Sequence, residues 1–322
     1  MIVAAVAATA LLVLLAAPRL LRLDEAPPVL AAAVFMSALL VRAAISVVAA
    51  AAMMIAVAAT DLFEAVSRWC WHAVLPVLTQ HFTFNGHAVA DAAFFLPGFL
   101  LMASAFSVAF GIARAARGVR RLFASGVGSG PSNCLIIGGK TVFVAAAGLR
   151  RPRIVVSAGA LTALDDDELY ASLEHEKGHI ARRHRWVLLL GELCRSIGRL
   201  VPGGRTTLAE LSFHLERDAD RFAIARYHEP HALASAICKA AESGSAATPT
   251  ATSLAGAGAG AGVVRRVSQL LTGMPQRGTS TTARIGGVVS ITLTVLVLAA
   301  VPPTTMAAVR SSAALPAFGC PH

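Results

Sequence analysis

Long apolar stretches separated by charged segments constrain the fold of this chain more than any other feature. Four such stretches occur, at residues 1–17, 28–60, 90–113 and 285–301. Hydrophobic residues make up 56% of the chain and charged residues only 14%, which is unusual for a soluble domain. About 20 consecutive apolar residues cross a bilayer as a helix, and a helix satisfies its backbone hydrogen bonds internally. The sequence therefore predicts four transmembrane helices and, as partner, a lipid bilayer.

The first stretch has an alternative interpretation as a signal peptide. A signal peptide carries positive charge before its apolar run and a small-residue cleavage site after the run. Here Arg19 and Arg22 follow the run instead, and no Ala-x-Ala site precedes them. We therefore expect a retained first span with its N-terminus outside the cell membrane.

The basic residues are concentrated between the third and fourth stretches. All but five of the 28 Lys and Arg residues lie from Arg114 to Arg284, and such an excess is typical of cytoplasmic segments. Residues 114–284 are therefore predicted to be a cytoplasmic domain, with an extracytoplasmic loop at 61–89 and a short extracytoplasmic tail at 302–322. Topology then accounts for the net charge of +10. Because no nucleic-acid motif accompanies that charge, no direct nucleic-acid partner is expected.

The five cysteines indicate neither a zinc ribbon nor a redox pair, because none has Cys-x-x-Cys spacing. In the predicted topology Cys70 and Cys320 share the oxidising side of the membrane. A disulfide between them is a hypothesis that the sequence leaves open.

The cytoplasmic region contains the stretch His175-Glu176-Lys177-Gly178-His179. On a helix, residues four apart project from one face, so both imidazoles can reach one metal ion. This spacing is the H-E-x-x-H pattern of zinc peptidases, in which the glutamate is the general base. Leu169, Leu173 and Ile180 form an apolar stripe that also includes Glu176, and a carboxylate on such a stripe needs a polar partner. The pattern predicts a zinc site with a catalytic Glu176.

A catalytic zinc site takes a third protein ligand and leaves one position open. Glu216 is favoured, because it lies on the next long predicted helix, which can pack antiparallel to the first, and because Asp220 follows it four residues later. Glu192 lies too far along the zinc helix to reach back, and Glu210 lacks such a carboxylate partner. His184 is predicted to be a surface residue.

Local patterns give a coarse secondary structure for this region. Residues Asp165 to Glu168 begin the zinc helix with capping and acidic first-turn residues, and the helix is expected to run to about Trp186, possibly to Leu200. The next helix is expected over Thr207–Tyr227. The remaining expectations are a flexible linker at Gly126–Pro131, short strands at Cys134–Ile137, Thr141–Ala147 and Arg153–Ser157, a flexible loop at 243–262 and a short helix from Arg265.

These motifs carry a family resemblance. The H-E-x-x-H stretch followed by Glu216-Arg217-Asp218-Ala219-Asp220 resembles the pattern of membrane gluzincins, which include HtpX-like quality-control peptidases and CAAX-prenyl endopeptidases. The strongest resemblance is to the BlaR/MecR antirepressor peptidases, especially their short actinobacterial members. The segments that carry it, besides the apolar spans before the zinc helix, are Gly148–Ser157, Ile180–Arg183 and Arg266–Leu271.

The resemblance implies a mainly α fold of multiple membrane spans plus a cytoplasmic gluzincin domain with a small β-sheet. It implies one zinc ion held by His175, His179 and Glu216, with Glu176 as general base and Asp220 orienting a histidine or an arginine. It also implies an edge strand that holds an extended substrate by β-augmentation, formed by Arg153, Ile154, Val155, Val156 and Ser157. The oxyanion donor stays open among Tyr227, His214 and Arg226.

The chain also departs from the drug-sensing members of that family. It has no Ser-x-x-Lys and ends within about twenty residues of the last predicted span, so direct β-lactam binding is not expected. The expected function is zinc-dependent endoproteolysis of a cytoplasmic protein, such as a transcriptional repressor. Alternatives are HtpX-like quality control of membrane proteins and a non-enzymatic receptor with a structural zinc site; an intact Glu176 argues against the receptor. Substrate, activating signal and oligomeric state are not determined by the sequence.

Overall fold

The computed structural model describes residues 23–58, 87–130, 133–227, 229–244 and 259–272, with a few positions between 281 and 294. Several predictions fall outside these residues: the first span, most of the fourth span, nearly all of the 61–89 loop, the 302–322 tail, and the cysteines Cys70 and Cys320. The described part is mainly helical with one small mixed sheet, as the sequence predicted.

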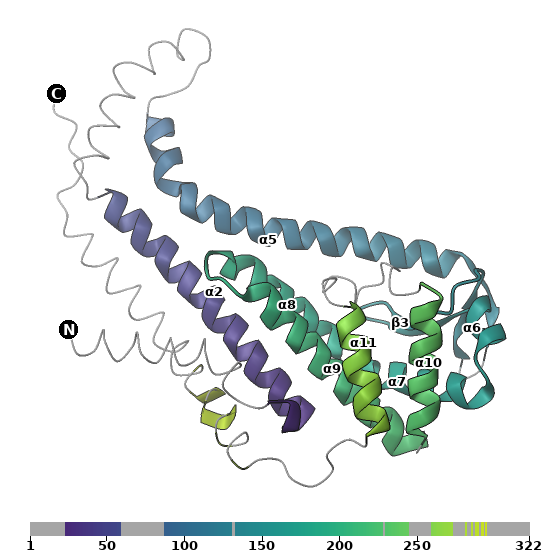
Figure 1. The fold of residues 1–322 in the computed structure, drawn as a ribbon. Coiled ribbons are helices and arrows are strands. Elements are labelled where there is room, and N and C mark those ends of the chain that lie inside the picture. Colours follow the sequence, from purple (N-terminus) through teal and green to yellow (C-terminus); the bar gives the residue numbers. More distant parts are fainter. Residues whose placement is uncertain are drawn as a thin grey trace, which may run out of the picture.

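Three helices form the centre of the molecule: α2 (Pro28–Ala58), α8 (His184–Ile197) and α9 (Gly204–Tyr227). They lie side by side in Figure 1, with α5 (His87–Ala124) running across them toward the sheet. Leu39 of α2 and Leu211 of α9 are fully buried in the core that these helices share. Small residues permit this packing, since a Cβ at Gly191 would touch side chains of both α2 and α9. The second predicted span and the predicted peptidase region therefore share one hydrophobic core.

The sheet has the strand order β1-β2-β4-β3. Its strands are β1 (Gly126–Ser129), β2 (Leu135–Ile137), β3 (Val144–Ala147) and β4 (Arg153–Ser157). β2 pairs with β4 in parallel, and the other pairs are antiparallel. One face packs on α6 (Ala158–Ala163), α7 (Asp166–Ala181) and α10 (Pro230–Glu242), and the other packs on the C-terminal end of α5.

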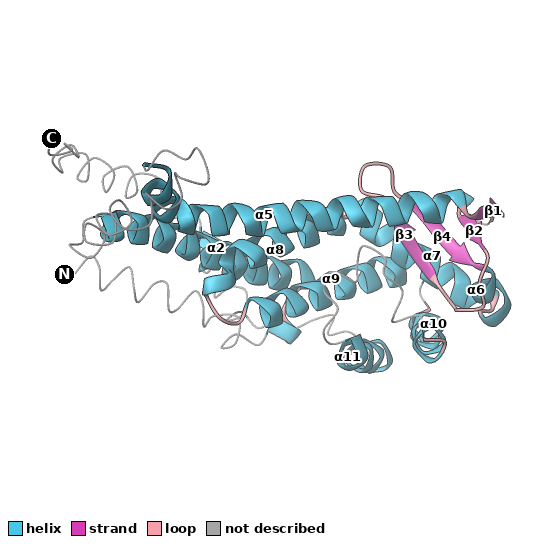
Figure 2. Ribbon diagram, turned by 90° about the horizontal axis from the view of Figure 1, so that it is seen from above, coloured by secondary structure: helices cyan, strands magenta, loops and turns pink. Residues whose placement is uncertain are grey.

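Helix α7 begins where the acidic cluster predicted it. The Asp165 side chain accepts a hydrogen bond from the Glu168 backbone, and the Glu168 side chain accepts one from the Asp165 backbone, which is a capping box. Glu168 also bonds Ser235 and Lys239 of α10, so the same residue attaches α10 to α7. α10 and α11 (Ala259–Leu271) lie on the side of the molecule opposite α5 (Figure 2).

Three local predictions are wrong. The Gly126–Pro131 segment is not a linker, because Gly126–Ser129 pairs with β2 as strand β1. The zinc helix does not continue to Trp186 or Leu200, since α7 ends at Ala181 and α8 begins at His184. The predicted 243–262 loop ends early, because α11 starts at Ala259. The short connector Leu23–Glu25, a 3-10 turn before α2, and the 3-10 turn Gly198–Leu200 complete the described elements.

Among the described residues, one helix is long and apolar enough to cross a membrane, over Pro28–Ala50. By length and composition alone, it also fits the core helix of a soluble protein. The division of the chain into spans and a cytoplasmic domain therefore stays a prediction.

Candidate metal centre

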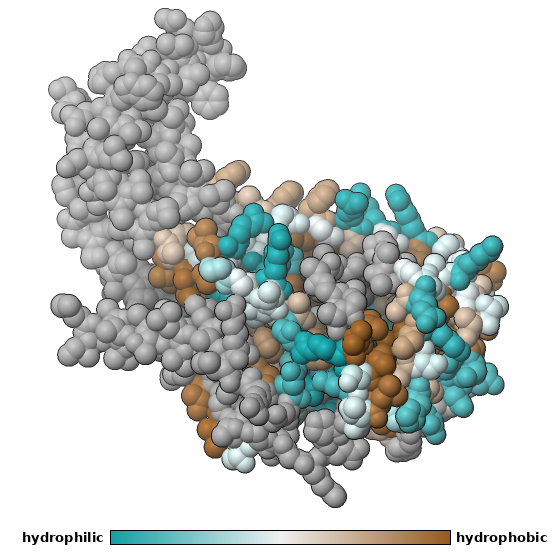
Figure 3. Space-filling model, viewed as in Figure 1, coloured by the Kyte–Doolittle hydropathy of each residue, from teal (hydrophilic) through white to brown (hydrophobic). Residues whose placement is uncertain are grey.

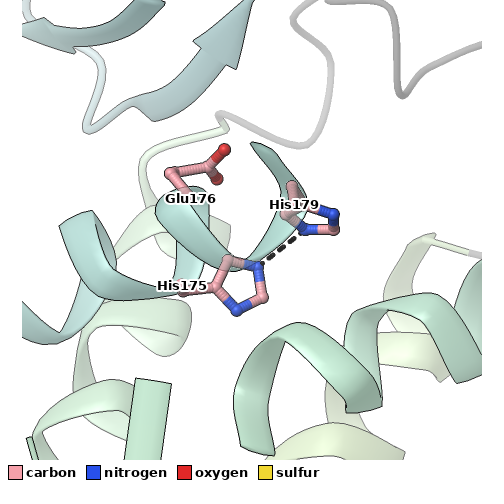
Figure 4. Close-up of side chains that lie close together, drawn as sticks. All are labelled: His175, Glu176 and His179. Carbon is pink, nitrogen blue, oxygen red and sulfur yellow. Dashed lines mark hydrogen bonds between the residues drawn. The ribbon is translucent and has the colours of Figure 1, made fainter. Parts of the chain in front are cut away.

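Three side chains from two helices converge at the centre of the predicted site. His175 Nε2 and His179 Nε2 of α7 lie 3.1 Å apart (Figure 4). Each of these nitrogens lies 3.4 Å from a carboxylate oxygen of Glu216 on α9. A tetrahedral zinc ion with ligand bonds of 2.0–2.2 Å would set neighbouring ligand atoms about 3.3 Å apart. The two imidazoles and the carboxylate therefore fit the donor set and the spacing that zinc requires.

Close packing of α7 on α9 brings Glu216 to the histidines. A Cβ at Gly178 would lie 3.1–3.2 Å from the Phe222 side chain, so glycine at this position permits the close approach. Leu211, Leu215 and Ala219 are buried on the stripe predicted for α9. Glu216 and Asp220 emerge beside that stripe and face α7, which explains why one helix supplies both carboxylates.

The second ring nitrogen of His175, Nδ1, faces a carboxylate. His175 Nδ1 lies 2.8 Å from Asp220 Oδ1. Burial opposes a positive charge on His175, but Asp220 and Glu216 outweigh it and raise the histidine pKa to about 10. Asp220 is therefore placed where it could orient the His175 ring, and that role, which the family resemblance implies, stays a prediction.

Arg266 lies at the site, although the sequence pointed to it only as the start of a segment that carries the family resemblance. From α11 it donates to both oxygens of Asp220 at 2.6 and 3.0 Å, and it lies 2.9 Å from Glu216 Oε2. Burial opposes ionisation of Glu216, yet His179 and Arg266 hold its pKa well below the usual range. Arg266 thus balances the buried carboxylate of Asp220 and the partly buried carboxylate of Glu216. It lies 46 residues beyond Asp220, and no sequence pattern connects the two positions.

His184 contradicts the prediction of a surface residue. Its exposed fraction is 3%, and its Nδ1 lies 3.0 Å from Nδ1 of His179. On the other side of the ring, His184 Nε2 lies 3.2 Å from Asp218 Oδ2. The prediction failed because it assumed one continuous helix, whereas the chain turns at Arg183 before α8 begins.

Glu176 projects from the turn between the two histidines (Figure 4) and is half-buried. Its Oε2 accepts a hydrogen bond of 2.6 Å from the backbone N–H of Ala146 in β3. The polar partner required by a carboxylate on an apolar stripe is therefore, in this structure, a strand backbone. This contact fixes the carboxylate on the side of α7 that faces the sheet.

The predicted edge strand Arg153–Ser157 is not at an edge. As β4 it lies between β2 and β3, so its backbone is paired with a neighbouring strand on both sides. Within the described sheet, β3 is the edge strand next to α7. Its Ala146 N–H is directed away from β4, toward Glu176.

A cavity of about 270 Å³ lies between β3, α7 and α10. His175, Glu176, His179 and Glu216 contribute polar groups to its wall, and Arg185 and Arg266 add positive charge. The rest of the wall is mostly apolar and is formed mainly by β3, the two residues before it, and α10. These apolar lining residues are Val142, Phe143, Val144, Ala145, Ala146, Leu164, Leu188, Leu233, Ala236, Ile237, Ala240, Ala241 and Val263. A cavity that combines a few polar side chains with a mostly apolar lining suits a polypeptide segment.

A comparison with protein families supports this reading of the geometry. Residues 141–201 match peptidase family M48. The matched stretch includes β3, the cavity-lining part of α7 and all of α8. M48 peptidases are metalloproteases that generally depend on zinc, and the match thus indicates a peptidase. No curated protein and no solved structure matches the chain.

The M48 match ends before Glu216, so the assignment of the third ligand depends on the geometry. Glu192, one of the two other candidates for the third ligand, forms an ion pair with Arg195 within α8. Glu210, the other, pairs with Arg265. The structure therefore brings His175, His179 and Glu216 together and keeps both competing glutamates elsewhere. The roles of the three as zinc ligands stay predictions.

Of the three candidate oxyanion donors, the two with described side chains, His214 and Arg226, do not line the cavity. His214 stacks on Phe35 of α2 with ring centroids 5.3 Å apart, and burial together with Arg217 lowers its pKa to about 3. Arg226 lies over the Phe222 ring. The side chain of Tyr227 is outside the described residues.

Proposed function

We propose that this protein is an integral-membrane zinc metalloendopeptidase. The observation that carries the proposal is the convergence of His175, His179 and Glu216 at tetrahedral spacing, with Glu176 beside them in a cavity. The M48 match over the same region supports peptide hydrolysis. A purely structural zinc site would need no carboxylate beside the metal other than its ligands. Glu176, which is not one of the proposed ligands, therefore favours an enzyme over a receptor.

The chain's own groups would divide the work of hydrolysis. Zinc, when bound, would act as a Lewis acid that activates a water and polarises the scissile carbonyl. Glu176 would accept the proton of the attacking water and deliver it to the leaving amine. The hydrogen bond from Ala146 holds the Glu176 carboxylate on the cavity side, where a substrate would lie.

Substrate binding is assigned to β3 instead of the β4 strand that the resemblance suggested. β3 is an edge strand of the described sheet, and it lines the cavity beside Glu176. An extended peptide that pairs with β3 would add a fifth strand beside the apolar wall. Because Glu176 accepts from the Ala146 N–H, the peptide would pair with the other outward backbone groups of β3. We propose that the substrate is a flexible segment of a cytoplasmic protein, such as a transcriptional repressor, in line with the BlaR/MecR resemblance.

Two features support residence in a membrane. Helix α2 has the length and hydropathy of a span. On α5, Phe99, Met102, Phe106 and Phe110 follow one another by three or four residues and are 55–71% exposed, so they form one apolar stripe on the surface. The basic residues Arg114, Arg117, Arg120 and Arg121 follow directly, as at a cytoplasmic membrane boundary. Figure 3 shows apolar residues along the α5 edge and hydrophilic residues toward the sheet.

The decisive experiment compares the wild-type protein with Glu176→Gln, both purified in detergent and supplied with zinc. Both proteins should bind about one zinc ion per chain. Cleavage of an unfolded casein substrate should fall at least about 100-fold in the variant, which is the scale of general-base catalysis. Glu174→Gln is the matched control, since Glu174 lies on the same helix but pairs with Lys177 and Arg226. Its cleavage rate should be unchanged.

Other outcomes separate the alternatives. Bound zinc without cleavage by the wild type, even with added membrane-protein substrates, would contradict the enzymatic proposal and favour a receptor. Preferential cleavage of misfolded membrane proteins over soluble repressors would favour quality control.

A further inference from the structure

The turn between α7 and α8 redirects His184 onto the metal centre. In a continuous helix, a residue five positions after His179 would point about 140° away from it around the helix axis. Instead, Arg183 adopts the left-handed conformation with φ 55° and ψ 34°, which is costly for a residue other than glycine. α8 therefore starts in a new direction, and its first residue, His184, folds back over His179. Strained backbone at such a position suggests a functional constraint.

The contacts of His184 form a chain that ends on a carboxylate. One ring nitrogen of His184, Nδ1, lies 3.0 Å from Nδ1 of His179. Its other ring nitrogen, Nε2, lies 3.2 Å from Oδ2 of Asp218. His179, His184 and Asp218 have exposed fractions of 6%, 3% and 7%, so water does not replace these contacts. Asp218 is attached to α9 two residues after Glu216, and the chain thus links α7, α8 and α9.

Metal binding would fix the direction of every hydrogen bond in this chain. A His179 that binds zinc through Nε2 must carry its proton on Nδ1. His184 Nδ1 then has to accept that proton's hydrogen bond, and the His184 proton has to lie on Nε2, where it donates to Asp218. Only one tautomer of each ring satisfies all three residues.

We propose that His184 and Asp218 are positioning residues that set the tautomer and ring orientation of the zinc ligand His179. The inference rests on the proposed metal centre and adds the support for its second histidine. Asp220 lies 2.8 Å from Nδ1 of His175 and would act on that ring directly. The two ligands are therefore supported differently: His175 by a carboxylate in direct contact, and His179 by a carboxylate acting through an intervening imidazole.

The test measures zinc affinity, by competition with a chromophoric chelator, on the full-length protein in detergent. His184→Leu keeps a similar side-chain volume and removes both hydrogen bonds. Its affinity for zinc should fall 10–100-fold, the range typical for loss of such a partner. His184→Asn places an amide oxygen where Nδ1 lies, so it should recover part of that loss. Asp218→Asn should weaken zinc about tenfold.

The matched control is Arg182→Met. Arg182 also lies near Asp218, at 3.7 Å, but it is exposed and has no contact with His179 among the described side chains. Its zinc affinity should equal that of the wild type. The absorption spectrum of the Co²⁺-loaded protein adds a readout of ligand geometry. It should change in His184→Leu and return toward the wild-type spectrum in His184→Asn.

Zinc affinity within threefold of wild type in a folded His184→Leu protein would overturn the proposal. If that variant does not fold, unchanged affinity in Asp218→Asn would overturn it equally. A wild-type protein that binds no stoichiometric zinc would refute the metal centre itself, a result distinguishable from loss of affinity in the variants alone.

Discussion

Each histidine of the metal centre uses its two ring nitrogens for different tasks. Nε2 of His175 and of His179 faces the other histidine and Glu216, while each Nδ1 lies within 3.0 Å of a residue outside the proposed ligand set. An imidazole can rotate about its side-chain bonds unless a contact prevents it. A partner at one ring nitrogen prevents that rotation and so fixes the direction in which the other nitrogen points. In the proposed metal centre, the ligand geometry would therefore depend on residues that do not contact the metal.

At the same scale, the left-handed conformation of Arg183 predicts a stability gain from glycine. Arg183→Gly should raise the free energy of unfolding by about 1 kcal/mol, because glycine adopts positive φ without a steric penalty. Thermal or denaturant unfolding measures the change. Arg182→Gly is the control, since Arg182 has φ −87° and glycine there should be neutral or destabilising. A destabilised Arg183→Gly protein would show that the Arg183 side chain stabilises the turn.

At the scale of elements, the site is made by the packing of α7 on α9. The ligands from α7 come within hydrogen-bonding distance of each other through helix periodicity alone, but Glu216 arrives only because two helix backbones approach closely at Gly178. Arg266 of α11 and Asp218 of α9 then complete the surroundings from separate elements. Displacing one helix should therefore disassemble the centre without altering any ligand.

Gly178→Leu tests this dependence. The new side chain would collide with Phe222, whose atoms lie 3.1–3.2 Å from the position of a Cβ, and should push α9 from α7. We expect zinc affinity to fall at least tenfold and stability to fall by about 1–3 kcal/mol, the usual cost of overpacking. Gly118→Leu on α5 is the control, because nothing lies within 4 Å of its Cβ. Equal zinc affinity in both variants would contradict the argument.

At the scale of the whole molecule, the peptidase region and the proposed membrane helices are not separate bodies. α2 shares a core with α8 and α9, and Arg217, next to Glu216, donates to the backbone of Leu23 and Asp24 just before α2. Arg265, next to Arg266, pairs with Asp24 as well. Residues adjacent to the candidate metal centre are thus tied to the start of the proposed span, and in the proposed membrane arrangement these contacts would hold α9 and α11 near the bilayer surface.

The membrane orientation predicts which part of α5 contacts lipid. Phe106→Trp should place an indole among acyl chains, since Phe106 is 71% exposed within the apolar stripe. Arg117→Trp should place one in water, beyond the stripe. In vesicles of brominated lipid, fluorescence added by the first substitution should be quenched and that added by the second should not. Equal quenching at both positions, relative to the wild-type tryptophans, would contradict this placement of α5.

The sequence predicted the parts of the site that depend on neighbouring residues. The capping box at Asp165 and Glu168 depends on local hydrogen bonds and was found where the acidic cluster placed it. The strand positions near β2, β3 and β4 followed from β-branched runs between turns. The break at Arg183 was missed because arginine gives no signal for a left-handed turn, and with it the burial of His184 was missed.

The sequence by itself determined which groups the predicted site contains, namely two histidines and a glutamate on one helix, and it placed apolar segments long enough to cross a membrane. Helix periodicity and hydropathy are local properties, so they can be read from neighbouring residues. Only the tertiary structure decided that β3 and not β4 forms the edge beside Glu176, and that Asp218, His184 and Arg266 surround the ligands. Strand order and contacts between helices depend on how distant segments pack, and the free energy of that packing is shared among residues that no local pattern connects.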